Sequence, residues 1–113
     1  MREVNMKEIK LTVHPFEMGE PKEAALKPLE EAAEVYGAWQ MLGETNQGDF
    51  ARVARLGTLS LEDDMRLSRL ADEIADCIQA CANLAARYDI DLDSAMRLCE
   101  KRNRDRGRYP LSD

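Results

Sequence analysis

The chain has 113 residues, of which 34% are charged and 5% aromatic, and its formal net charge is −6. A chain of this length corresponds to one domain, and its negative charge argues against a general nucleic-acid-binding protein. The composition is rich in alanine, leucine, glutamate and arginine, which favours helices over strands. We therefore expect an all-α fold.

The sequence also bears on location. No apolar run approaches the roughly 20 residues of a membrane span, and the N-terminus lacks the apolar stretch of a signal peptide. The three cysteines, Cys77, Cys81 and Cys99, are an odd number without a disulfide framework of spacings. We expect reduced thiols in a cytoplasmic protein that does not enter a membrane.

The N-terminal third of the chain predicts one irregular and one helical segment. Residues 1–20 are expected to be irregular, with a short extended stretch before Pro15. A helical pattern follows from Lys22 to about Leu42. Pro28 lies within it, so either the helix kinks there or a short helix ends and a second begins. The residues after Pro28 are apolar on almost every side, which predicts burial by neighbouring helices or a second subunit.

The middle of the chain predicts a connection and a long helix. Residues 43–60 contain three glycines and polar turn residues, and they allow at most one short helix, at 49–55. A helix is expected over 61–88, with Ser60 as its N-cap. Apolar residues spaced three and four apart predict its core stripe: Leu67, Leu70, Ala71, Ile74, Ile78, Cys81, Leu84, Ala85 and Tyr88. Asp91 can cap a last helix that turns basic and ends at Gly107.

Two short acidic clusters stand out within these apolar patterns. Residues three or four apart share one face of a helix, so Glu31 and Glu34 project together, with Glu30 one turn behind Glu34, and Glu73 projects with Asp76. Most such carboxylates in proteins are ordinary surface residues, but apolar flanks argue against that here. If the two helices pack side by side, four or five carboxylates meet. Because such charges repel, we expect a divalent cation among them.

The order of these motifs resembles the all-α nucleotide pyrophosphohydrolases of the MazG-like superfamily. Glu-Glu-x-x-Glu at 30–34 is followed by Glu-x-x-Asp at 73–76, by a helix-to-helix corner at 84–92 and by an Asn- and Arg-rich ending at 100–109. The resemblance covers roughly residues 22–110. Two departures are a longer gap between the acidic motifs and Cys99 where many members have a lysine.

The resemblance implies both a fold and an activity. The fold is a set of antiparallel helices over 21–110 in a four-helix-bundle-like core, with 111–113 as a tail, completed in a homodimer or homotetramer. The activity is Mg²⁺-dependent cleavage of a nucleoside triphosphate between its α and β phosphates, giving the monophosphate and pyrophosphate. The implied ligands of Mg²⁺, or of Mn²⁺, are Glu31, Glu34, Glu73 and Asp76. Glu30 would bind metal or orient the attacking water, and Glu30 and Glu34 are the catalytic carboxylates.

Several residues are candidates for contacting the substrate. The basic end of the last helix offers phosphate and sugar ligands: Lys101, Asn103, Arg104, Arg106 and Arg108. Their alternative is a helix C-terminus with solvated cations. Tyr36 and Trp39 can stack on a base, although aromatic residues on a buried helix more often pack in a core. Asn83 shares the stripe of Glu73 and Asp76, so it lies near the substrate or serves the helix corner.

Two other classes of function fit the same helical pattern. The first is a non-catalytic helical interaction module that keeps the fold and binds a partner in its acidic cleft, although such a module has no need of five inward carboxylates. The second is a di-iron carboxylate bundle, which needs Glu-x-x-His pairs. No histidine follows either acidic motif, so we set the di-iron bundle aside.

Overall fold

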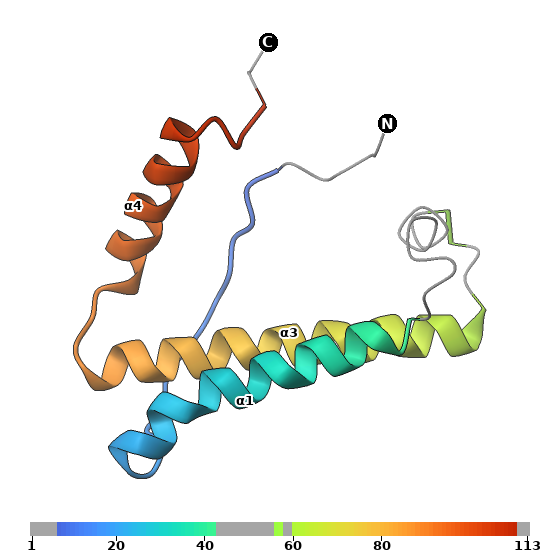
Figure 1. Cartoon of the computed structure of the whole chain (residues 1–113), viewed down its shortest axis with the longest axis horizontal. Helices are drawn as coiled ribbons and strands as arrows, with labels where there is room; N and C mark the ends of the chain where they lie inside the picture. The colour runs from blue at the N-terminus through green and yellow to red at the C-terminus, as the bar shows by residue number, and fades with distance from the viewer. Residues whose placement is uncertain (1–6, 43–55, 58–59, 111–113) are drawn as a thin grey trace.

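The computed structural model describes residues 7–42, 56–57 and 60–110, and all of its regular structure there is helical. This confirms the predicted all-α class. The predicted short helix at 49–55 and the tail at 111–113 lie outside the described residues. The helices are α1 (Pro21–Gln40), α3 (Leu61–Arg87) and α4 (Leu92–Asp105), shown in Figure 1. None of them combines the length and apolar character needed to cross a membrane.

The ends of the helices follow from local side-chain interactions. Ser60 caps α3, because its hydroxyl oxygen accepts a hydrogen bond from the Asp63 backbone N–H at 3.1 Å. Asp91 caps α4 in the same way, accepting from the backbone N–H of Ser94 at 3.1 Å. Both caps satisfy N–H groups that have no partner within the helix. Gly107, with φ of 69°, follows the end of α4, so these predictions are confirmed.

α1 is a single helix that contains Pro28. The alternative in which a short helix ends before Pro28 and a second begins there is therefore wrong. α1 and α3 lie side by side and run in opposite directions (Figure 1). This antiparallel pair is the main helix contact in the described part of the chain.

The buried apolar residues of the described chain are small, and Ala80 is on the face of α3 that meets α1. In the described ranges the buried apolar side chains are all alanines: Ala24, Ala38, Ala80, Ala82 and Ala85. Larger apolar residues lie outside, with Ile74 43% and Ile78 37% exposed. Alanine side chains let two helix backbones approach closely, but they bury little apolar surface.

The predicted core stripe of α3 is therefore partly wrong. Leu67, Leu70 and Leu84 are half-buried and Ala85 is buried, whereas the remaining predicted members are exposed: Ala71, Ile74, Ile78, Cys81 and Tyr88. α3 turns a neighbouring face toward α1, the face that carries Glu73 and Ala80. The physical reason is that periodicity marks the apolar side of a helix but does not identify which neighbour covers it.

α4 stands away from the α1–α3 pair (Figure 1). It leaves the end of α3 after a turn in which Asp89 has φ of 54°. Its apolar residues Met96 and Leu98 are exposed. A four-helix-bundle-like core is thus not formed by the described residues of one chain.

The N-terminal segment crosses α3 and is held there by three polar side chains spaced one helical turn apart: Gln79, Asn83 and Arg87. We call residues 14–19 the strap. Each of the three side chains binds its backbone: Gln79 Nε2 donates to His14 O at 3.0 Å, Asn83 Oδ1 accepts from Phe16 N–H at 2.9 Å, and Arg87 Nη1 donates to Met18 O and Gly19 O at 3.4 and 3.1 Å. The strap thereby covers one end of the α1–α3 contact.

Removing the cap of α4 should destabilise that helix in a pH-dependent way. Hydrogen bonds from Ser94, first from its side chain and then from its backbone, hold the pKa of Asp91 below its ordinary value of 3.8. A depressed folded-state pKa gives stability that is present above the ordinary value and is lost as the pH falls through the lowered one. We expect Asp91→Ala to lower the thermal unfolding midpoint by a few degrees near neutral pH and to have no effect in strong acid.

The measurement is thermal unfolding followed by far-ultraviolet circular dichroism. Asp93→Ala is the matched control, because it removes a carboxylate from the first turn of α4 that does not cap the helix. A loss of equal size at neutral and strongly acidic pH would contradict the capping role.

Candidate metal centre

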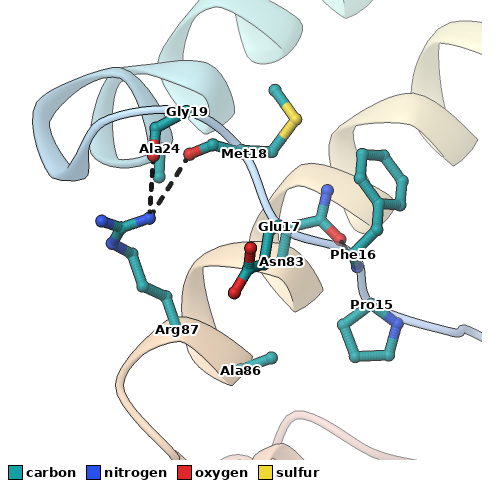
Figure 2. A pocket seen from close by; sticks show the side chains of 9 residues that line it. All are labelled: Pro15, Phe16, Glu17, Met18, Gly19, Ala24, Asn83, Ala86 and Arg87. Atoms are coloured by element: carbon teal, nitrogen blue, oxygen red, sulfur yellow. Dashed lines mark hydrogen bonds between the residues drawn. The ribbon is translucent and has the colours of Figure 1, made fainter.

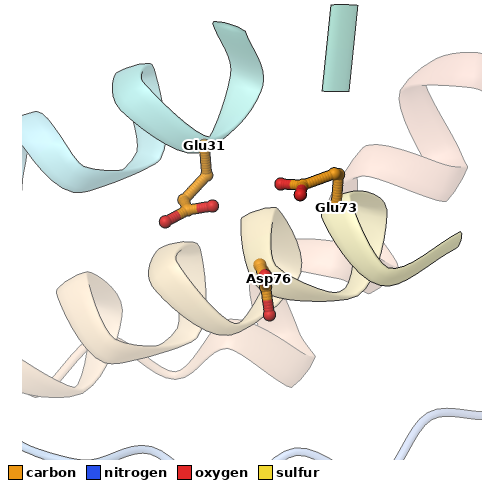
Figure 3. Close-up of side chains that lie close together, drawn as sticks. All are labelled: Glu31, Glu73 and Asp76. Carbon is orange, nitrogen blue, oxygen red and sulfur yellow. The ribbon is translucent and has the colours of Figure 1, made fainter. Parts of the chain in front are cut away.

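Three carboxylates from two helices converge between α1 and α3 (Figure 3). α1 contributes Glu31, and α3 contributes Glu73 and Asp76. One oxygen of each lies within 4.8 Å of the others. Glu31 is 7% exposed, Glu73 is half-buried and Asp76 is exposed. The predicted convergence of the two acidic motifs is therefore seen for these three residues. The cluster is buried at Glu31 and open to solvent at Asp76.

Each of the two inner carboxylates has one paired and one unpaired oxygen. Lys27 Nζ lies 3.2 Å from Glu31 Oε1, and Arg69 Nε lies 3.4 Å from Glu73 Oε1. The second oxygen, Oε2, is buried in both residues and finds no hydrogen-bond donor in the described part of the chain. A buried carboxylate oxygen without a partner costs free energy. A bound cation would remove that cost.

The chemistry of these donors suits a hard divalent cation. All the oxygens come from carboxylates, which are the ligands that Mg²⁺ and Mn²⁺ prefer. The counter-ions leave the inward oxygens of Glu31 and Glu73 available, and exposed Asp76 leaves a side open to solvent. Mg²⁺ usually binds through a few carboxylates and keeps several waters or phosphate oxygens. The residues therefore fit such an ion.

Glu34 belongs to the edge of this cluster. A hydrogen bond with the carboxyl group of Glu73 raises the pKa of Glu34, and repulsion by the charge of Glu31 raises it further. The hydrogen bond requires a proton on Glu34, because two ionised carboxylates can only accept. Ionised Glu34 therefore does not satisfy the unpaired oxygen of Glu73. The raised pKa reflects the closeness of Glu34 to Glu73 and Glu31.

The remaining acidic residue of the first motif, Glu30, lies outside the cluster. Its side chain is 61% exposed, and its nearest charged partner is Lys27, with Nζ 3.7 Å from Glu30 Oε2. The step from Glu30 to Glu31 turns the helix by about 100°, which moves Glu30 off the face that meets α3. Its catalytic role stays a prediction.

The aromatic candidates form a stacked pair on α1. Tyr36 and Trp39 are stacked on each other, with ring centroids 5.5 Å apart and planes inclined by 26°. Both are exposed, so the expected core packing is not seen in the described residues of one chain. An exposed aromatic pair on α1 is available to a partner or a ligand.

The basic candidates all lie on or after α4, away from the cluster (Figure 1). Lys101 Nζ and Arg104 Nη2 each bind a carboxylate one turn away, at 3.0 Å. Asn103 Oδ1 accepts from Arg108 Nη1 at 3.1 Å, and Arg106 is exposed. The described part of a single chain does not bring these residues to the acidic cluster.

Asn83 has a structural role that the sequence did not reveal. Its Oδ1 accepts from the strap at Phe16 and from Gln79 Nε2 at 2.9 Å. The counter-ions Lys27 and Arg69 were also missed. Their signal was present, because each lies four residues before the glutamate that it binds and such spacing favours an ion pair. The strap contacts had no comparable signal, because their partners are backbone groups.

Comparisons of the chain with protein-family models, with curated proteins and with solved structures each gave no match. The resemblance to MazG-like enzymes therefore stays an interpretation of the motifs. The candidate site is defined by the meeting of Glu31, Glu73 and Asp76.

Removing the charge of Glu34 should stabilise the metal-free protein. Because its folded-state pKa lies above the ordinary 4.5, the folded state loses stability as the pH rises from that value through the raised one. We expect Glu34→Gln to raise the thermal unfolding midpoint near neutral pH in the presence of a chelator, and to be neutral in strong acid. Added Mg²⁺ should stabilise the variant less than the natural chain.

Differential scanning fluorimetry over a pH series, with chelator and with Mg²⁺, makes this measurement. Glu30→Gln is the control, because it makes the same substitution on α1 outside the cluster. Indistinguishable midpoints for the two variants at neutral pH would show that Glu34 feels no excess negative charge.

Proposed function

We propose that this protein is a Mg²⁺-dependent hydrolase that cleaves a nucleoside or deoxynucleoside triphosphate between the α and β phosphates. The products are the nucleoside monophosphate and pyrophosphate. The observation that carries the proposal is the meeting of Glu31, Glu73 and Asp76 around two buried carboxylate oxygens that have no partner among the described residues. The order of the acidic, corner and basic motifs along the sequence supports the same reaction class.

Glu31, Glu73 and Asp76 would hold the cation, with Glu34 beside them. When bound, Mg²⁺ or Mn²⁺ supplies positive charge to the phosphate oxygens and lowers the pKa of a bound water. The cation is also required for approach, because an acidic cluster alone repels a triphosphate. Activity should therefore depend on a divalent cation.

The side chains around the cluster have separable tasks. Glu34, whose pKa is raised by Glu73 and Glu31, accepts a proton from the water that attacks phosphorus. Lys27 and Arg69 fix one oxygen of Glu31 and of Glu73, so that the other oxygen points inward. Glu30 is the second candidate for orienting the water.

A second copy of the chain would complete the molecule. An alanine-lined contact buries little apolar surface, while Ile74 and Ile78 remain exposed on one face of α3. Pairing α1 and α3 with the same helices of a second copy gives a four-helix bundle that covers this face. In such a dimer the basic end of α4 would approach a partner's metal centre and contact phosphate oxygens.

Asp76→Asn tests the hydrolase directly. It removes one charge from the cation site on its open side, so the folded core should persist. We expect the rate of pyrophosphate release from a panel of triphosphates with Mg²⁺ to fall on the order of 100-fold or more, because even outer-shell changes at metal sites cost 10- to 100-fold. Asp72→Asn, the same change one turn earlier on α3, should retain the natural rate.

Two results would count against the proposal. One is a natural rate in Asp76→Asn, which would remove that carboxylate from the reaction. The other is no pyrophosphate release by the natural chain from any triphosphate with either Mg²⁺ or Mn²⁺. That result would favour the alternative of a helical interaction module.

Ile78→Glu tests the proposed dimer. A charge placed in the centre of a buried apolar interface is costly, so this variant should be monomeric in sedimentation velocity and should unfold at a lower temperature than the natural dimer or tetramer. Ile9→Glu places the same charge at an exposed isoleucine outside α1 and α3 and should keep the natural mass. A natural chain that sediments as a monomer would contradict this assembly.

A further inference from the structure

A cavity of about 550 Å³ lies between the strap, the start of α1 and the end of α3 (Figure 2). Apolar groups from all three elements line it, among them Phe16 and Met18 of the strap, Ala24 of α1 and Ala86 of α3. Its one deeply buried polar side chain in the described residues is Asn83. Polar groups of Glu17, Asn83 and Arg87 also line it, and it is partly open to solvent, so a ligand that carries both apolar and polar groups would fit it.

The side-chain oxygen of Asn83 has hydrogen-bond partners, whereas its side-chain nitrogen has none among the described residues. Oδ1 accepts two hydrogen bonds, from the backbone N–H of Phe16 and from Gln79 Nε2, both at 2.9 Å. These partners fix the orientation of the amide, because a backbone N–H and an NH₂ group can only donate to an oxygen. Nδ2 has no acceptor within the described ranges, although the residue is 5% exposed. Because Asn83 lines the cavity, this nitrogen is free to donate to a bound ligand.

The cavity lies along the same faces of α1 and α3 as the candidate metal centre. On α3, Asn83 follows Asp76 by seven residues, and on α1, Ala24 precedes Glu31 by seven. Seven residues are two helical turns, so both pairs lie on one face of their helix and about 10 Å apart along its axis. This separation is comparable to the span from a base to the phosphate of a nucleotide.

We infer that the strap cavity holds the nucleoside end of the substrate while its phosphates lie at Glu31, Glu73 and Asp76; this inference rests on the proposed function. Nδ2 of Asn83 donates to a carbonyl oxygen of the base, since a carbonyl projects from the ring and can reach a buried amide. Phe16 and Met18 contact the ring. Bases that carry a carbonyl group bind more tightly than adenine, which has none.

The strap is part of this site because it forms one wall of the cavity. Gln79 and Arg87 hold it through its carbonyl groups, and they are positioning residues rather than ligands of the base. Asn83 has both tasks, with its oxygen on the strap and its nitrogen toward the ligand. This division allows the two tasks to be separated by substitution.

Asn83→Asp separates them, because it keeps an oxygen for Phe16 and Gln79 but replaces the NH₂ donor by an acceptor. The probes are the non-hydrolysable α,β-methylene analogues of UTP and ATP, and inorganic tripolyphosphate, each titrated with Mg²⁺ by calorimetry. We expect the variant to bind the UTP analogue roughly tenfold or more weakly, since one buried hydrogen bond is lost. Tripolyphosphate, which has no nucleoside, should bind to both proteins equally.

Ala86→Leu provides a second variant, because it fills the cavity without altering a polar group. It should weaken the UTP analogue and spare tripolyphosphate, whereas Ala75→Leu, an exposed position on the same helix that does not line the cavity, should change neither. If Asn83→Asp does not fold, Ala86→Leu decides the question.

The outcomes separate the inference from the function on which it rests. A natural chain that binds the UTP analogue, with both cavity variants binding it equally well, overturns the inference and leaves the hydrolase proposal intact. Tighter binding of the ATP analogue than of the UTP analogue overturns the assignment of Asn83 to a base carbonyl. A natural chain that binds neither nucleotide analogue nor tripolyphosphate with Mg²⁺ overturns the proposed function.

Discussion

The contact of α1 with α3 brings the carboxylates of Glu31 and Glu73 close enough to repel each other. Each has a buried oxygen that has no partner among the described residues. Lys27 and Arg69 offset part of the charge, but each is bound to the other oxygen of its glutamate. A cation at the inward oxygens would join the two helices while it removes the repulsion. Metal binding and helix pairing are then one equilibrium, because a ligand held by the folded pair stabilises it.

The distribution of large and small residues explains how the carboxylates come so close. Buried alanines such as Ala38 and Ala80 allow the α1 and α3 backbones to approach each other. This close approach lets one oxygen each of Glu31, Glu73 and Asp76 lie within 4.8 Å of the others. Large apolar residues, including Leu29 and Ile74, instead lie on the outer faces of the pair. The chain thus uses its inner surface to position charges, and its outer surface is suited to burial against another subunit.

Local chemistry explains which features could be predicted from the sequence. Ser60 and Asp91 were predicted as caps because a cap interacts with the residues that follow it, and the acidic motifs were found because helical spacing places Glu73 and Asp76 on one face. The face of α3 that contacts α1 and the position of α4 depend on packing between distant segments, so periodicity alone misassigned Ile78 to a core that one chain does not form.

The contact between the strap and α3 gives the proposed substrate site a direction. On α3 the functional residues follow one another in the order Arg69, the acidic pair, and then Asn83 at the strap end. With the nucleoside under the strap, the α phosphate would reach the carboxylates and the departing pyrophosphate would extend toward Arg69, which is largely exposed. A guanidinium at that end can accept the charge that develops on the leaving group. About four turns of α3 would then bind the base, the metal and the leaving group in sequence.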